Sequence, residues 1–397
     1  MHILIIEPGS TGHHLIYLEK IAKGYLASGH NITLCTLAST HENPLIKSLA
    51  LSFKSRINLT YIPDRAYQEA LKSKFSDIGR EIKLRRIFKA AYKKTHSSCA
   101  VDYVFLPFLD YCLYSIGLLG SPFGKTKWGG ICMRPSFHYQ ASGVIAPKPK
   151  LSRIKELLFK KCLSSASLDK IFTIDEILEK YITNTSHKPP IKIKYIPDPA
   201  ELIGEHTFKS ARSRLGIIES AIVILVYGAL NERKGIQALI EALNNSTQLD
   251  DVHLLLVGKQ SEKINNYIHA HASQLKTKER LYTLDRFVNT DEQQMVFAAS
   301  DIVWLGYQEH FTMSGVLVLA AISGKPIIGT REGLIGWYVN EKKLGVCIDT
   351  QKPSEIQLAV QLITSEINNN SDLYKNQHFN DHNWEEFSRT LSFTKNN

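Results

Sequence analysis

Short apolar runs alternate with amphipathic segments along most of the chain. The run HILIIE, from residue 2, is followed by HLIYLEKIAKGYLASG, where apolar residues recur at helical spacing. After residue 210 the alternation restarts with AIVILVYGAL, GIQALIEALNN and VHLLLVG. A helix is expected next, near residues 261–275, and the alternation then continues to KPIIG. Strands that alternate with helices indicate parallel sheets with helices on both faces. The sequence therefore predicts an α/β fold with two doubly wound, Rossmann-like domains.

The expected domain boundary lies where two prolines interrupt the pattern. The 397 residues suit two domains better than one core. The prolines of YIPDPA, residues 195–200, end a strand where the first series of elements stops. We expect an N-terminal domain at residues 1–200 and a C-terminal domain at residues 201–375. A short helical pattern follows near residues 384–391, and we expect residues 376–397 to pack back on the N-terminal domain.

Composition suggests a location and a class of partner. The formal net charge is +10, and the positive excess lies in the first 200 residues. This favours a polyanionic partner, whether an anionic membrane surface, a phosphorylated acceptor or nucleic acid, unless the surface is merely solvated. No apolar run approaches the roughly 20 residues that span a bilayer, and MHILIIEP reads as a first strand, not a signal peptide. Six scattered cysteines without a C-x-x-C pair predict a reduced, cytoplasmic protein that lacks a zinc site.

One basic stretch bears on membrane binding. FSDIGREIKLRRIFKAAYKK, residues 75–94, has apolar residues at near-helical spacing with basic residues between them, and KPKLSRIKELLFKKCL repeats the theme. Basic amphipathic helices suit anionic membrane surfaces. A helix that packs on the core and exposes a basic face explains the pattern equally well.

Two loops carry candidate chemistry for an anionic ligand. In EPGSTGHH, residues 7–14, Gly12 lets the backbone approach a ligand, Thr11 or His13 can face it, and the following helix start offers free N–H groups. The loop lacks the G-x-G-x-x-G spacing of dinucleotide sites, which disfavours an NAD enzyme. In NERKG, Arg233 and Lys234 stand before a helix, where cations are unfavourable unless an anion lies between them.

Several motifs together resemble one enzyme family. YGALNERKGIQALIEAL, LLLVGKQ, DRFVNTDEQQMVFAASDIVWLGY and GVLVLAAISGKPIIGTREGLIGWYV, and in the first half SLDKIFTIDEILEKYI and IKYIPDPAEL, are similar to segments of GT-B glycosyltransferases, specifically the retaining family 4. The likeness covers most of residues 1–30 and 165–350. It implies two Rossmann-like domains facing across a cleft, with the acceptor on the N-terminal domain and the donor on the C-terminal domain.

The resemblance also implies roles for single residues. Lys234 would hold the leaving diphosphate, and Arg233 would replace the family's second cation, because its usual position is Ala229. The loop with Thr11, Gly12 and His13 would lie against the diphosphate and acceptor. The base-binding loop would supply Phe287 and Val288.

The segment YQEHFTMSGVLVLAAISGKPII, residues 307–328, departs from the family. Two glutamates that contact the transferred sugar and the ribose would fall at Phe311 and Leu319. What remains is a helix start that offers backbone N–H groups and a hydroxyl to phosphate oxygens. The residues expected to bind the donor here are Glu309, His310, Ser314, Gly315 and Val316.

The strand GGICMR ends near an acceptor-side position of the family. Arg134 falls there and can bind an anionic sugar or phosphate through its planar guanidinium. His138, which follows in the same loop, is the alternative.

These features predict a glycosyltransferase that moves a sugar from a nucleotide-activated donor to a glycan or lipid-linked glycan. The resemblance implies retention of configuration. We expect no metal and no cofactor beyond the nucleotide-sugar co-substrate, no nucleic-acid partner, and a cytoplasmic protein peripheral to the inner face of the membrane. A catalytically lapsed GT-B protein that binds a nucleotide or glycan, or a nucleotide-sugar epimerase, are the alternatives.

Overall fold

The computed structural model describes residues 1–10, 13–72, 77–185, 191–370, 373–374 and 379–391. The chain forms two compact units. Unit 1 comprises Met1–His138, Lys148–Pro197 and Trp384–Asn397, and unit 2 comprises Tyr139–Pro147 and Asp198–Asn383. Residues 139–147, expected in the N-terminal domain, thus group with the second unit.

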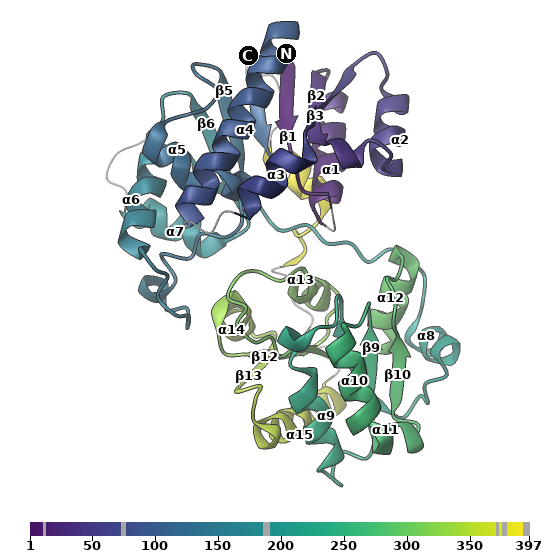
Figure 1. Cartoon of the computed structure of the whole chain (residues 1–397). Helices are drawn as coiled ribbons and strands as arrows, with labels where there is room; N and C mark the ends of the chain where they lie inside the picture. Colours follow the sequence, from purple (N-terminus) through teal and green to yellow (C-terminus); the bar gives the residue numbers. More distant parts are fainter. Residues whose placement is uncertain (11–12, 73–76, 186–190, 371–372, 375–378, 392–397) are drawn as a thin grey trace. The chain divides into compact units, whose positions relative to one another are not determined.

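Unit 1 is built on a seven-stranded parallel sheet. Its strands are β1 (His2–Ile6), β2 (Asn31–Leu37), β3 (Ile57–Ile62), β4 (Tyr103–Leu106), β5 (Lys127–Cys132), β6 (Leu168–Thr173) and β7 (Ile193–Tyr195), in the order β3-β2-β1-β4-β5-β6-β7. Its helices are α1 (His13–Ala27), α2 (Pro44–Ser52), α3 (Asp64–Leu71), α4 (Asp77–Ser98), α5 (Leu113–Leu119), α6 (Ser152–Leu163), α7 (Glu176–Thr185) and α16 (Trp384–Leu391), with 3-10 turns η1 (Ala38–Thr40) and η2 (Leu109–Tyr111). Helices cover both faces of this sheet (Figure 1).

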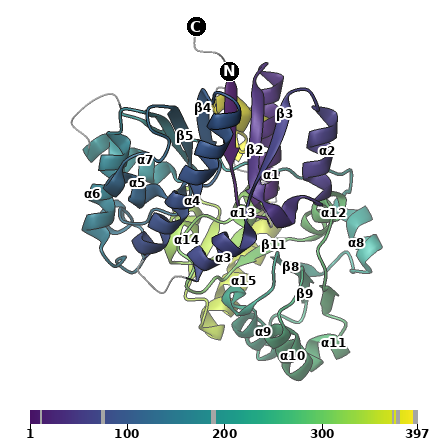
Figure 2. The ribbon, with the colours of Figure 1, turned by 45° about the horizontal axis from the view of Figure 1, so that its top comes forward.

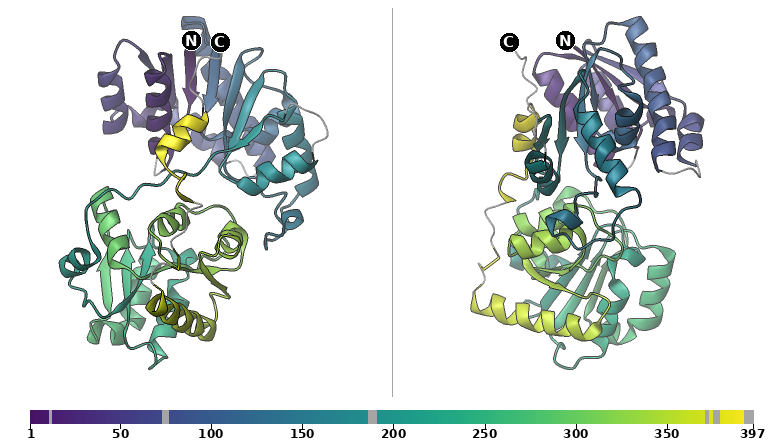
Figure 3. Two further views of the ribbon diagram at one scale, coloured as in Figure 1. Left: turned by 180° about the vertical axis from the view of Figure 1, so that it is seen from behind. Right: turned by 90° about the vertical axis from the view of Figure 1, so that its left-hand side faces the viewer.

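Unit 2 repeats this plan with six parallel strands. They are β8 (Ile222–Tyr227), β9 (Val252–Val257), β10 (Leu281–Leu284), β11 (Ile302–Leu305), β12 (Ile327–Thr330) and β13 (Gly345–Ile348), in the order β10-β9-β8-β11-β12-β13. The helices are α8 (Phe208–Leu215), α9 (Ile236–Asn244), α10 (Glu262–His271), α11 (Ser273–Thr277), α12 (Thr290–Ala299), α13 (Gly315–Ile322), α14 (Gly333–Glu341) and α15 (Pro353–Asn369), with 3-10 turns η3 (Gln140–Ser142) and η4 (Glu232–Lys234). The sheet again lies between two helical layers (Figure 3).

The hydrophobic pattern explains this architecture. All six residues of β9, VHLLLV, are buried, as expected for a strand covered on both faces. Helix α12 begins at a capping box in which Asn289 and Glu292 bond each other's backbone N–H groups. The predicted class, two doubly wound Rossmann-like domains, is confirmed. One difference is that the helix expected near residues 261–275 is two helices, α10 and α11, which meet at Ala272.

The C-terminal helix belongs to unit 1. In α16, Trp384 and Phe387 pack edge-on against Tyr17 of α1, with ring centroids 5.4 and 5.3 Å apart. Figure 3 shows this helix in yellow beside the sheet of unit 1. Among the helices that the structure describes, none is both long enough and apolar enough to cross a membrane.

Candidate functional site

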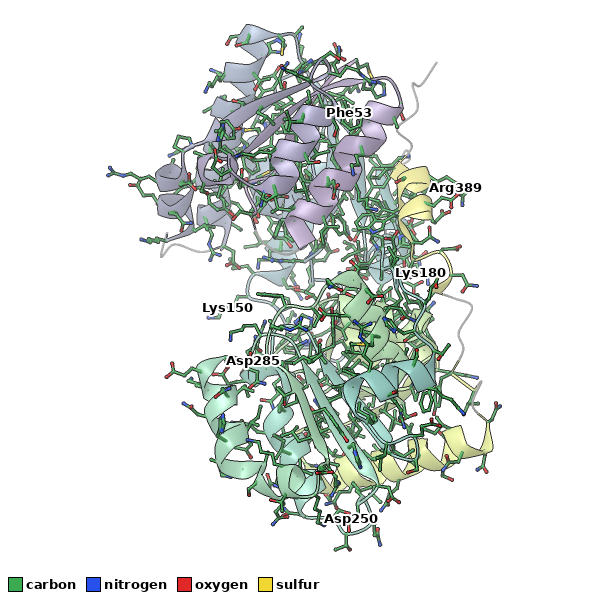
Figure 4. The ribbon with its side chains drawn as sticks, turned by 90° about the vertical axis from the view of Figure 1, so that its right-hand side faces the viewer. Phe53, Lys150, Lys180, Asp250, Asp285 and Arg389 are labelled. Carbon is green, nitrogen blue, oxygen red and sulfur yellow. The ribbon has the colours of Figure 1, made fainter. Side chains whose placement is uncertain are left out.

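The order of strands in unit 2 points to one edge of its sheet. The chain runs outward from β8 to β9 and β10, then returns to β11 on the other side of β8. Ligands of doubly wound sheets bind at such a switch point, outside the carboxyl ends of the strands. Figure 4 marks both edges: Asp285, after β10, lies at the carboxyl edge, and Asp250, before β9, lies at the opposite edge.

Lys234, in the turn after β8, lies at this switch point. Its ammonium group donates to the carbonyl oxygen of Tyr227 (2.9 Å) and to the hydroxyl of Tyr307, the second residue after β11. The Nζ atom also lies 4.1 Å from the centroid of the Tyr307 ring. An ammonium carries three N–H donors, and the third has no partner among the described residues. Lys234 is thus a partly exposed cation with one donor available to an anion.

The end of β11 and the loop after it hold η4 in place. The indole N–H of Trp304 donates to the carbonyl oxygen of Lys234 (2.7 Å), and the backbone N–H of Gln308 donates to that of Arg233 (2.8 Å). The residue after Lys234 must be a glycine, because φ of Gly235 is +66° and a Cβ there would lie 2.2 Å from the carbonyl oxygen of Gly306. These contacts explain the Lys-Gly pair of the sequence and place Lys234 beside Tyr307.

The segment before α13 lies beside this cation. The Ser314 hydroxyl lies 3.5 Å from that of Tyr307 and makes no capping bond to α13, so the first N–H groups of the helix, at Gly315 and Val316, remain for another acceptor. His310 packs edge-on against Tyr307 at 5.3 Å and donates from Nε2 to the Met313 carbonyl oxygen (3.3 Å).

The charge around His310 is positive. Burial lowers its pKa, and the charges of Arg233 and Lys234 lower it further. The imidazole therefore stays neutral near pH 7, while two cations remain beside it. Arg233 itself has an exposed side chain. The switch point of unit 2 thus combines two cations, a neutral histidine and a helix start, which suits a phosphorylated ligand.

The other donor-site candidates in unit 2 lie on neighbouring loops. Phe287, in the loop between β10 and α12, is 82% exposed, and Val288 beside it is half-buried. Glu309 is exposed and adopts a left-handed backbone conformation with φ of +53°. Leu319 is buried within α13, so no carboxylate occupies the family's ribose-binding position.

The site candidates of unit 1 differ in whether the structure describes them and in whether they are exposed. Thr11 and Gly12 lie outside the described residues, as does the side chain of His13, where α1 begins. Arg134 is exposed, with its guanidinium 5.0 Å from the centroid of the Phe108 ring. His138 has no exposed surface and lies 3.0 Å from the buried carboxylate of Asp175. His138 therefore has no surface that a ligand could contact in this structure, and its role stays a prediction.

Several functional candidates escaped the sequence analysis. Tyr307 and Tyr227 surround Lys234, and burial raises the pKa of Tyr227 to about 12. Unit 1 adds the buried Glu7 at the end of β1, with its neighbour His14. One signal was available for Glu7, because a carboxylate that ends an apolar strand is costly to bury without a purpose. Within the described ranges, no group of three or more His, Cys, Asp or Glu side chains could hold a metal ion.

Comparison with known proteins finds one family model that matches part of the chain, together with related proteins and similar solved structures. Residues 207–378 match the family described as Glycosyl transferases group 1. A curated relative, the lipopolysaccharide core biosynthesis glycosyltransferase LpsE of Rhizobium meliloti, is 26% identical over 155 residues, which is 39% of this chain and 43% of LpsE. The chain spans about half the length of the curated relatives it matches.

Solved structures resemble the whole chain. The sucrose-phosphate synthase of Thermosynechococcus elongatus superposes with a TM-score of 0.69 at 16% identity, covering 99% of this chain and 97% of that one. Anabaena HepE, solved with UDP and glucose, gives a TM-score of 0.65 at 14% identity, covering 99% of this chain and 98% of HepE. At these identities the likeness establishes the fold alone.

Proposed function

We propose that this chain, a GT-B protein whose residues 207–378 form a glycosyl transferases group 1 domain, transfers a sugar from a nucleotide diphosphate donor to a glycan or lipid-linked glycan. Unit 2 holds the donor, and unit 1 holds the acceptor. In this proposal transfer retains the configuration of the sugar and needs no metal ion.

The observation that carries the proposal is the position of Lys234. When the bond between the sugar and the diphosphate breaks, negative charge grows on the leaving phosphate oxygen. The unpaired N–H of Lys234 offers a charge-assisted hydrogen bond to this oxygen, and two tyrosines hold the ammonium group in place beforehand. The N–H groups of Gly315 and Val316 and the cation of Arg233 supplement it. A cation fixed in this way replaces the metal that other enzymes use to neutralise a diphosphate.

The nucleoside is held mainly by its base. Leu319 offers no acceptor to the ribose hydroxyls, whereas Phe287 exposes its ring on the loop after β10. In the proposal the base lies against Phe287 and Val288, and Glu309 and His310 lie towards the sugar. Donor affinity then depends on the diphosphate more than on the ribose.

The acceptor belongs to envelope or surface glycan synthesis. LpsE, the relative, is named for lipopolysaccharide core biosynthesis, and HepE was solved with UDP and glucose. The basic excess of the first 200 residues suits an anionic membrane surface that presents a lipid-linked glycan. Lys150, before α6, is one of the exposed basic residues (Figure 4). We propose a protein that works at the cytoplasmic face of the membrane.

A lapsed enzyme that only binds a nucleotide is the second candidate, because Phe311 and Leu319 replace the two family carboxylates. Release of nucleoside diphosphate from a panel of UDP, GDP and ADP sugars separates the two. We expect slow donor hydrolysis with at least one sugar nucleotide, faster release when glycan acceptors are added, and loss of both in Lys234→Ala. Binding of a nucleotide without any release would support the lapsed protein instead.

A further inference from the structure

Unit 1 has its own switch point, where Arg134 lies together with side chains that have no assigned role. The chain runs from β1 to β2 and β3, then returns to β4 on the other side of β1 (Figure 2). Glu7 follows β1, Phe108 and Tyr111 follow β4, and Arg134 follows β5. We call Glu7, His14, Phe108, Tyr111 and Arg134 the acceptor cluster; its assignment to the acceptor rests on the proposed function. By the same rule as in unit 2, a ligand is expected at this edge.

Glu7 is a buried carboxyl group, and one of its two oxygen atoms has no hydrogen-bond partner among the described residues. Its Oε1 atom accepts from the backbone N–H of Gly9 (2.6 Å), from His14 Nδ1 (3.2 Å) and from the Tyr111 hydroxyl (3.4 Å). Its Oε2 atom is buried without a partner, and the residue is 1% exposed. Burial raises the pKa of Glu7, although these three bonds oppose the rise. Leaving such a group in a core costs stability, which points to a role other than folding.

The bonds to Glu7 decide how His14 can act. Because Oε1 already accepts from two other donors, the proton of the shared hydrogen bond lies on His14 Nδ1. In the neutral imidazole, Nε2 then carries a free lone pair. No described residue bonds to Nε2, and one fifth of the side chain is exposed. A Cβ on residue 9 would lie 2.4 Å from the His14 ring, so Gly9 permits this placement.

Phe108 connects His14 to a cation. Its ring centroid is 4.5 Å from that of His14 and 5.0 Å from the guanidinium carbon of Arg134. Asp110 fixes the start of the Arg134 loop by accepting from the backbone N–H groups of Met133 and Arg134, both at 2.9 Å. The Arg134 guanidinium forms no ion pair with a described side chain. A hydrogen-bond acceptor, His14 Nε2, and a cation that forms no ion pair with a described side chain therefore both lie near one aromatic ring, Phe108.

We propose that the acceptor cluster binds a sugar that carries an anionic group. His14 Nε2 accepts a hydrogen bond from a sugar hydroxyl, and Arg134 binds a phosphate or carboxylate substituent of the same sugar. Glu7 is a positioning residue that keeps the His14 proton on Nδ1. The acceptor of the reaction would then be an acidic glycan, with a class of kinase or sugar-acid transferase acting before this enzyme.

The His14 ring itself supplies the test. The full chain is labelled with nitrogen-15 histidine, and its imidazole nitrogens are followed during titration with glucose 6-phosphate, glucuronate, glucose and inorganic phosphate. We expect the His14 signals to show a proton on Nδ1. The chemical shift of Nε2 should change on addition of both acidic sugars, and the affinity fitted from this change should be at least tenfold higher than for glucose or phosphate alone. A preference for one acidic sugar tells phosphate from carboxylate.

Three variants separate binding from folding. His14→Asn keeps a donor near Glu7 but removes Nε2, and it should weaken sugar phosphate binding at least tenfold without lowering Tm. Arg134→Gln should reduce glucose 6-phosphate binding to the level of glucose. Glu7→Gln, which retains an acceptor at Oε1, should bind within threefold of the wild type, whereas Glu7→Leu should lose the single His14 tautomer.

The control is His96→Asn, because His96 is another histidine of unit 1 that stacks on a tyrosine, although its Nδ1 accepts a backbone N–H (from Val101, 3.2 Å) where His14 Nδ1 donates to Glu7. It should change nothing. If neither acidic sugar shifts the His14 signals, or if binding survives both His14→Asn and Arg134→Gln, the inference is wrong. No transfer is measured, so either result leaves the donor site of unit 2 to its own tests.

Discussion

The two units use the same sheet plan but place opposite chemistry at the switch point. In unit 2 a lysine is held by the carbonyl oxygen of Tyr227 and the hydroxyl and ring of Tyr307, partly exposed and charged. In unit 1 a glutamate is held by a backbone N–H, His14 and the hydroxyl of Tyr111, fully buried. One edge therefore offers a cation directly to a ligand, whereas the other offers an imidazole whose proton is set by a hidden carboxyl.

Under the proposed function, the two units divide the reaction between a donor site and an acceptor site. A diphosphate needs positive charge close to the atoms that gain electrons, so the lysine must be reachable. An acceptor hydroxyl needs a hydrogen-bond partner in a fixed orientation, and the group that fixes it can be buried. The order of strands selects the edge, and the residues that follow β1, β4, β8 and β11 select the ligand.

The largest expected effect is the loss of turnover when Lys234, the cation of unit 2, is removed. Lys234→Ala should lower turnover by about 10²–10³-fold, because removing one fixed donor to a developing anion costs about 2.7–4 kcal/mol. Initial rates of sugar transfer measure this. Lys263→Ala is the control, since this lysine of the same unit is exposed and forms an ion pair with Glu232 at 3.3 Å. Turnover of Lys234→Ala within threefold of the wild type would remove the residue from the site.

A smaller effect is expected at the start of α13. Gly315→Val places a branched side chain next to the N–H groups that face the phosphate, and should weaken binding of nucleoside diphosphate at least tenfold. Calorimetric titration gives the affinity. Ser323→Val, at the other end of the same helix, should leave it unchanged. Equal affinities for Gly315→Val and the wild type would place the anion elsewhere.

The two edges should differ in the sign of their pH dependence. The pKa of Glu7 is raised from 4.5, so its stabilising contribution is complete below pH 4.5 and is lost as pH rises through the folded-state pKa. The pKa of His310 is lowered from 6.5, so stability is lost as pH falls below 6.5. Urea denaturation at several pH values should show that Glu7→Gln gains stability relative to the wild type at high pH, and that His310→Gln gains stability at low pH.

Glu81 provides a positive control for the pH dependence expected of the Glu7 carboxyl group. Burial raises its pKa to about 8, and its carboxylate accepts from the backbone N–H of Ser115 at 2.9 Å. Glu81→Gln should therefore gain stability between pH 4.5 and 8, as Glu7→Gln does. Parallel curves for Glu7→Gln and the wild type would show that the Glu7 carboxyl titrates normally.

The smallest effect concerns the ribose. Leu319 cannot accept hydrogen bonds from the ribose hydroxyls. The affinities of the preferred nucleotide and its 2′-deoxy analogue should therefore differ by less than about tenfold, well under the loss expected for a charged hydrogen bond. Competition binding measures the ratio. A hundredfold preference for the ribo form would reveal another ribose contact.

The sequence predicted the repeating architecture because parallel strands covered on both faces are continuous apolar runs, as in β9. It missed β3, INLTYI, whose four middle residues are exposed or half-buried. Lys234 was predictable because the Lys-Gly pair and the neighbouring helix are local in sequence. Its partner Tyr307 was not, since Tyr307 is 73 residues away and comes close to Lys234 through the pairing of β8 with β11.

The same reason hid the contacts of His14. They depend on Tyr111 and Phe108 from a distant strand end, whereas the side chain of His13, the sequence candidate in this loop, lies outside the described residues and its role stays a prediction. His138 was attractive because it follows a strand, but Asp175 lies 37 residues on and pairs with it in the core. Local patterns predicted where strands end, whereas partner choice required the sheet order.

The most direct test is calorimetric binding of UDP, GDP, ADP and CMP to the full chain, to Lys234→Ala and to Lys263→Ala. We predict that at least one nucleoside diphosphate binds the wild type and Lys263→Ala equally, and binds Lys234→Ala at least tenfold more weakly. CMP, with a single phosphate, should bind more weakly than that diphosphate to the wild type. Absence of binding by every diphosphate, or equal binding to Lys234→Ala, would contradict the assignment of the unit 2 switch point as the donor site.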